Sequence, residues 1–164
     1  MTKVIAILFL FFIVCTGVAQ DSVSIYNPDS DAGKDIELAV AKAKESNKHV
    51  LLQIGGNWCP WCIKLHKFYN DNPIIDSILK ADYILVMVNY SRENKNEELL
   101  KNLGYPQRFG FPVLVVLDEN GNRIHTQDSA LLEKGTLYDL EKLKRFLLNW
   151  NRAAVSPGSY MDKK

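Results

Sequence analysis

The stretch that decides the fold is Gly55-Gly56-Asn57-Trp58-Cys59-Pro60-Trp61-Cys62, residues 55–62 of a 164-residue chain. Before it, residues 49–54 form a short apolar run of the buried-strand type. The two glycines and the asparagine then turn the chain. Pro60 favours a helix start, because a first-turn proline lacks only an N–H that would have no helical partner. The two cysteines are therefore expected on either side of a helix start.

A cysteine pair at a helix start has a specific chemical meaning. The partial positive charge and free N–H groups of a helix N-terminus stabilise a thiolate, which is the reactive form of cysteine. Cys59 is the predicted nucleophile, and Cys62, one turn later, is placed to attack the mixed disulfide that Cys59 forms with a substrate. Pro60 removes a competing backbone donor, and Trp61 offers an apolar, partly exposed surface for docking.

The rest of the pattern alternates between strands and helices, with an antiparallel pair near the end. A turn at Asn72-Pro73 is expected to break the second helix into two. Predicted strands cover residues 22–26, 49–54, 83–88, 112–117 and 123–127. Predicted helices begin at Asp31 or Asp35, at Pro60, after Asn72-Pro73, at Glu97 and around Leu137, the last continuing to Trp150. The sequence thus predicts an α/β fold.

The N-terminal residues indicate export. Lys3, an apolar run over residues 4–14 and the small residues Gly17-Val18-Ala19 are typical of a signal peptide, predicted over residues 1–19. A membrane anchor needs about 20 apolar residues, more than this run offers. The predicted domain covers residues 20–152, and the tail 153–164, with Ser-Pro-Gly and charges, is predicted to be disordered.

Cleavage of the signal peptide would also change the net charge and the number of cysteines. The whole chain carries 20 Lys and Arg against 19 Asp and Glu, so loss of Lys3 leaves no net charge and no electrostatic support for a nucleic-acid role. Loss of Cys15 leaves Cys59 and Cys62 as the only thiols in an oxidising compartment. Two cysteines this close cannot cross-link distant parts of a fold.

Taken together, the Trp58-Cys59-Pro60-Trp61-Cys62 motif, the later Gly110-Phe111-Pro112 before an apolar strand and the turn at residues 118–121 resemble the thioredoxin family. The resemblance covers residues 31–150. It implies a three-layer fold with a central mixed sheet flanked by helices, and a cis proline at Pro112. It also implies that Trp58, Trp61, Phe111 and Pro112 shape a substrate-binding groove, in which an extended segment pairs with the backbone of Phe111.

Two departures from the family pattern bear on mechanism. Typical thioredoxins hold a buried acid six residues before the first cysteine, and here that position is Gln53, which cannot act as a base. The Pro60-Trp61 dipeptide is closer to the Pro-aromatic pair of glutaredoxins than to the Gly-Pro of thioredoxins. Since that dipeptide influences thiolate stability and reduction potential, the direction of electron flow stays open.

The leading hypothesis is a thiol-disulfide oxidoreductase that acts on exported proteins in the periplasm or outside the cell, without a cofactor. It would work with a redox partner protein, as a monomer, and without stable membrane insertion. The alternative is a non-enzymatic binding module in which the disulfide is only structural. A metal site of Cys59, Cys62 and His66 is disfavoured, because no second cluster of ligands lies nearby. Covalent haem attachment is excluded by Ile63, where that motif requires histidine.

His66, His49 and His125 are interpreted as ordinary exposed residues.

Overall fold

A computed structural model describes residues 24–161 of the chain. Its centre is a four-stranded sheet in the order β2-β1-β3-β4. Strand β1 pairs in parallel with β2 and antiparallel with β3, and β3 pairs antiparallel with β4. The strands are β1 (His49–Gly55), β2 (Tyr83–Asn89), β3 (Val113–Leu117) and β4 (Arg123–Asp128). The predicted mixed sheet is confirmed.

Seven α-helices and two short 3-10 helices surround or extend this sheet in the described residues. They are α1 (Ala32–Ser46), α2 (Pro60–Asp71), α3 (Pro73–Asp82), α4 (Glu97–Asn102), η1 (Pro106–Phe109), η2 (Ser129–Leu132), α5 (Leu140–Asn149), α6 (Arg152–Val155) and α7 (Gly158–Met161). A small hairpin of β5 (Glu133–Lys134) and β6 (Leu137–Tyr138) precedes α5. Over residues 24–161, no helix is both long enough and apolar enough to cross a membrane.

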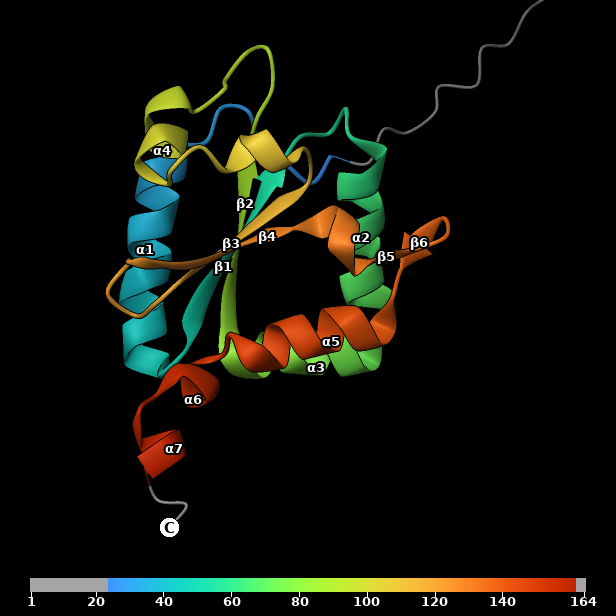
Figure 1. Ribbon diagram of the computed structural model, residues 1–164. Coiled ribbons are helices and arrows are strands. Elements are labelled where there is room, and N and C mark those ends of the chain that lie inside the picture. The colour runs from blue at the N-terminus through green and yellow to red at the C-terminus, as the bar shows by residue number, and fades with distance from the viewer. Residues whose placement is uncertain (1–23, 162–164) are drawn as a thin grey trace, which may run out of the picture.

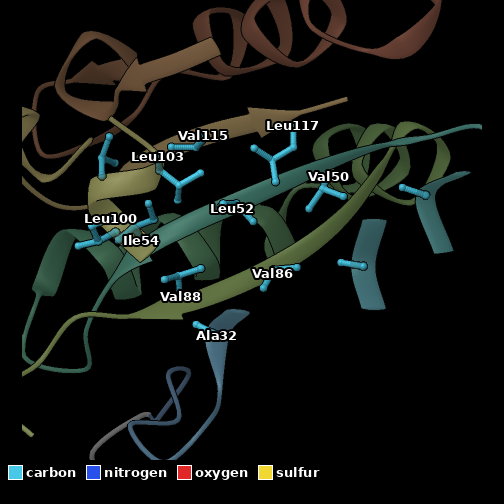
Figure 2. Packing of buried hydrophobic residues seen from close by; sticks show 13 residues of the cluster. Ala32, Val50, Leu52, Ile54, Val86, Val88, Leu100, Leu103, Val115 and Leu117 are labelled. Atoms are coloured by element: carbon cyan, nitrogen blue, oxygen red, sulfur yellow. The ribbon is translucent and has the colours of Figure 1, made fainter. Parts of the chain in front are cut away.

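The helices form two layers, one on each face of the sheet (Figure 1). Helices α1 and α4 lie on one side, and α2, α3 and α5 lie on the other. Successive side chains of β1 point to opposite faces of the sheet and so pack into two different cores. Val50, Leu52 and Ile54 point into the core under α1 and α4, which Figure 2 shows. Leu51 belongs to the opposite core, and Gln53 and Gly55 share its parity, so all three face the side of α2.

Local sequence signals explain where the helices begin and end. Asp31 caps α1, since its Oδ1 accepts from the backbone N–H of Lys34 at 3.1 Å. Asn47 ends α1 in the left-handed conformation, with φ of 56°. Asn72 caps α3 by accepting from the N–H groups of Ile74 and Ile75, and Pro73 takes the first helical position. The predicted break at Asn72-Pro73 is therefore confirmed.

Three local predictions differ from the structure. Residues 24–26 do not form the strand predicted over 22–26, because their backbone groups bond to the side chain of Asn57 instead of a neighbouring strand. Leu137, predicted to open the last helix, lies in β6, and α5 begins only after its cap residue Asp139. The tail predicted to be disordered contains α6 and α7. The predicted signal peptide, 1–19, lies outside the described residues.

His49 also corrects the interpretation of the histidines as exposed. Its side chain is buried, and its Nδ1 lies 2.9 Å from the backbone oxygen of Trp150. Because a carbonyl oxygen only accepts, Nδ1 donates this bond. Nε2 of His49 lies 3.6 Å from a carboxylate oxygen of Glu119. His49 therefore joins the start of β1 to the end of α5, at the end of the sheet opposite the cysteines.

Candidate active site

Cys59 and Cys62 form a disulfide at the N-terminus of α2. Their Cα atoms are 5.2 Å apart. Cys59 is the cap residue of the helix, and Pro60 is at the first helical position, as predicted. Cys62 is completely buried, whereas 4% of the surface of Cys59 is exposed. Of the two residues, Cys59 is thus the less buried.

The helix start favours negative charge on Cys59. The backbone N–H of Cys62 donates to Sγ of Cys59 at 3.2 Å. The first turn of α2 contains no acidic residue that would repel a thiolate. When the disulfide is reduced, the same N–H and the positive end of the helix dipole are in place to stabilise a Cys59 thiolate.

Trp58 and Phe111, two of the residues that the family resemblance assigns to a substrate-binding groove, lie together near the disulfide. Their rings meet edge to face with centroids 5.5 Å apart, and Tyr90 stacks on Phe111 at 4.7 Å. Nε1 of Trp58 donates to the backbone oxygen of Tyr90 at 2.7 Å, although 56% of Trp58 remains exposed. Gly56 leaves room for this arrangement, since a Cβ there would overlap the indole and lie 2.7 Å from the Tyr90 oxygen. The three rings, Trp58, Tyr90 and Phe111, are called the aromatic group below.

A hollow of about 600 Å³ opens next to the aromatic group. Trp58, Tyr90 and Asn57 form part of its wall, and the polar connection after β2 forms another part. Arg92, Glu93 and Lys95 bring charges of both signs to its edge. Sequence reasoning had assigned no function to this connection.

Pro112 stands at the entry to β3, where the Phe111–Pro112 peptide bond is cis. Val113 pairs with Ile54, so continuing the register by one residue places Pro112 level with Gly55, just before the active-site loop. The hydroxyl of Ser129 donates to the carbonyl oxygen of Pro112. By contrast, no residue of the described chain bonds to the backbone N–H or C=O of Phe111.

Trp61 is the predicted docking residue that lies apart from the aromatic group. Its ring is partly buried and meets Tyr138 edge to face at 5.5 Å. The ammonium of Lys64 lies 4.4 Å from the centre of the indole, a cation–π distance. Trp61 therefore joins α2 to the β5–β6 hairpin and presents only part of its surface to solvent.

Gln53 lies beneath the disulfide, fully buried on β1. Its Nε2 donates to the hydroxyl oxygen of Tyr26 at 2.7 Å and to the backbone oxygen of Cys62 at 3.1 Å. Its Oε1 is buried without a hydrogen-bond partner in the described structure. Sequence reasoning selected Gln53 but missed Tyr26, which packs with both cysteines.

His66 follows Cys62 by four residues on α2. Burial lowers the pKa of its imidazole below the ordinary 6.5, and its Nδ1 is buried without a partner among the described residues. Over residues 24–161, no group of three or more His, Cys, Asp or Glu side chains is arranged to hold a metal ion.

Comparison with known proteins places this geometry in a family. The model of a family described as thioredoxin-like matches residues 31–119. The chain belongs to the thioredoxin-like family. No curated protein matches its sequence.

Solved structures share the thioredoxin-like fold with this chain. A disulphide isomerase from Xylella fastidiosa Temecula1 superposes with a TM-score of 0.69 and 24% identity, covering 77% of this chain and 96% of the other. The C-terminal domain of DsbD from Neisseria meningitidis, in its oxidised form, gives a TM-score of 0.51 and 18% identity, covering 73% of this chain and 97% of the other. At these identities, the likeness establishes a shared fold.

Proposed function

We propose that this thioredoxin-like protein is a thiol-disulfide oxidoreductase of exported proteins, with Cys59 as nucleophile and Cys62 as resolving cysteine. The observation that carries the proposal is the disulfide at the start of α2, in which Cys59 caps the helix and Cys62 is fully buried. This asymmetry gives the two sulfurs different tasks. An external thiol or disulfide meets Cys59, and only an internal reaction reaches Cys62.

In the reducing direction, the Cys59 thiolate attacks a substrate disulfide and forms a mixed disulfide while one substrate sulfur leaves. Cys62 then attacks Sγ of Cys59, the bond to the substrate breaks, and the Cys59–Cys62 disulfide reforms. The second substrate sulfur takes the electron pair and the proton that Cys62 loses. In the oxidising direction the same steps run in reverse. A redox partner protein returns the cysteine pair to its starting state, and the chemistry needs no cofactor.

Substrate binding is assigned to the aromatic group and the loop before β3. The free N–H and C=O of Phe111 are available to pair with an extended segment next to the disulfide, in the manner of an added strand. Trp58, more than half exposed, offers an apolar contact that costs little side-chain entropy. Trp61 contributes the part of its ring that Tyr138 and Lys64 leave open.

The deciding experiment measures the reduction potential and the rate of insulin reduction for the wild-type protein and for Cys59→Ser. We expect activity in the wild type and none above background in the variant. If the wild-type protein is no more active than Cys59→Ser, the disulfide is structural and the protein is a binding module. A Cys62→Ser variant should trap a mixed disulfide on Cys59, and partners trapped from an exported fraction would identify substrates. Recovery of the mature protein from that fraction, starting after residue 19, tests export.

A further inference from the structure

The Tyr26 hydroxyl lies beneath the disulfide with a hydrogen that no described acceptor takes. Its oxygen accepts from Nε2 of Gln53 at 2.7 Å. The orientation of the Gln53 amide is fixed, because the same nitrogen donates to the backbone oxygen of Cys62, and that carbonyl can only accept. Gln53 thus uses the oxygen of Tyr26 as an acceptor and leaves the O–H hydrogen to be donated elsewhere.

Gly55 has no side chain, and both this hydroxyl and the sulfur of Cys62 lie next to the space that its absence leaves. A Cβ at residue 55 would overlap Sγ of Cys62 and would lie 2.9 Å from Oη of Tyr26. Both atoms therefore border the space that a side chain would fill. A buried O–H without an acceptor is unfavourable. The Tyr26 hydroxyl therefore stabilises a state of the cysteine pair that places a strong hydrogen-bond acceptor next to it. Reduction turns Cys62 from a disulfide sulfur into a thiol or thiolate, which supplies that acceptor.

Among the described residues, no charged group acts on the Tyr26 hydroxyl. Tyr26, Cys59 and Cys62 form one buried apolar cluster. Besides burial, the groups that shift the pKa of Tyr26 are Gln53 and Tyr138, and neither is charged at neutral pH. On α2, the lowered pKa of His66 keeps that imidazole neutral near pH 7. Burial raises the pKa of Tyr26 far above 10, so the phenol keeps its proton and acts as a donor, not as a base.

We propose that Tyr26 donates a hydrogen bond to the thiolate of Cys62 during resolution, and that Gln53 is the positioning residue that holds the hydroxyl in place. This inference rests on the proposed oxidoreductase function. In the step concerned, Cys62 loses its proton by way of water to the departing substrate sulfur, attacks Cys59 and displaces the substrate. Tyr26 remains protonated throughout. The buried acid of typical thioredoxins is thus replaced by a tyrosine and a glutamine that favour the Cys62 anion without accepting its proton.

The test measures the pKa of Cys62 directly. The full chain contains three cysteines, so Cys15→Ser and Cys59→Ala leave Cys62 as the single thiol. The chemical shift of an isotope-labelled Cβ of Cys62, followed by NMR across a pH series, gives its pKa without any reagent having to reach the buried sulfur. Adding Tyr26→Phe should raise that pKa by about one unit, which is about tenfold less thiolate below the pKa. No redox substrate takes part, so the result is independent of whether the wild-type protein reduces insulin.

Tyr83→Phe is the matched control. It also removes one buried hydroxyl, which donates to the backbone oxygen of Leu147 at 2.6 Å at the far end of the sheet, and it should leave the pKa of Cys62 unchanged. An equal pKa in the Tyr26→Phe and parent proteins would overturn the proposal. If Tyr26→Phe does not fold, Gln53→Met decides the matter. It keeps the hydroxyl but no longer holds it, so the pKa of Cys62 should rise by a smaller amount, and no rise would overturn the proposal.

Discussion

The side-chain amide of Asn57 bonds to both backbone polar groups of Tyr26. Oδ1 of Asn57 accepts from the Tyr26 N–H at 2.9 Å, and Nδ2 donates to the Tyr26 oxygen at 2.8 Å. The same amide also bonds to the backbone of Ile25 and the hydroxyl of Ser24. A single side chain in the active-site loop therefore takes the place of a neighbouring strand for the segment that carries Tyr26.

Asn57→Ala should release this segment and leave backbone groups of Ile25 and Tyr26 without partners. We expect the free energy of unfolding to fall by about 1–3 kcal/mol, measured by urea denaturation of the oxidised protein. Asn70→Ala is the control, because Asn70 is exposed on α2 and makes no side-chain hydrogen bond in the structure. Equal stability of the two variants would show that the Asn57 contacts do not hold the segment.

Gly55→Ala should disturb the disulfide itself. Its new methyl group would overlap Sγ of Cys62, and the rigid sheet on which Gly55 lies cannot move away easily. We expect a loss of about 1–3 kcal/mol in the free energy of unfolding, as for overpacking in a core. Gly33→Ala, in α1, adds the same methyl group at 3.3 Å from Oδ1 of Asp31 and should have little effect, since alanine favours a helix. A stable Gly55→Ala protein with unchanged melting temperature would contradict this account.

Much of the fold follows from local sequence signals. Pro60 and Asn72-Pro73 mark helix starts because proline fits only the first turn, and the loop 118–121 connects two strands because glycine there adopts φ of 83°. The active-site cysteines and Gln53 were also recognisable, because the motif and its spacing lie within ten residues. These predictions depend on neighbours in the chain, where periodicity and capping residues carry the information.

Contacts between distant residues were not predictable in this way. Tyr26 precedes its partner Gln53 by 27 residues. The alternation of polar and apolar residues around Tyr26 indicated a strand, whereas the side chain of Asn57 makes the hydrogen bonds that a neighbouring strand would have made. His49 resembled a surface residue because its partners, Trp150 and Glu119, are far along the chain. The β5–β6 hairpin has two residues in each strand, too few for alternation to be visible. In each case the decisive partner is brought in by tertiary packing.

Trp58→Ala should reduce catalysis on protein substrates, with only a small effect on the stability of the fold. The indole is largely exposed, so its loss removes one hydrogen bond to Tyr90 and the edge contact with Phe111, but little buried core. We expect KM for a protein disulfide such as insulin to rise by about two- to tenfold, while reduction of the Cys59–Cys62 disulfide by dithiothreitol changes little. Leu38→Ala, which removes a similarly exposed apolar side chain from α1, should change neither. An unaltered KM in Trp58→Ala would remove Trp58 from the substrate-binding surface.

His66 should make the stability of the oxidised protein depend on pH. Burial lowers its pKa in the folded state below the unfolded value of 6.5, so the unfolded chain binds a proton more readily. The contribution of neutral His66 to the free energy of unfolding is fully present above pH 6.5. It is lost as the pH falls, first through the pKa of this histidine in the unfolded chain and then through its lower pKa in the folded protein. Urea midpoints between pH 7.5 and pH 5 should therefore decline less in His66→Gln than in the wild type. His125→Gln is the control, because it also removes a half-buried imidazole, here one that stacks on Trp150. If His66→Gln keeps the full decline, other groups account for the acid sensitivity of the fold.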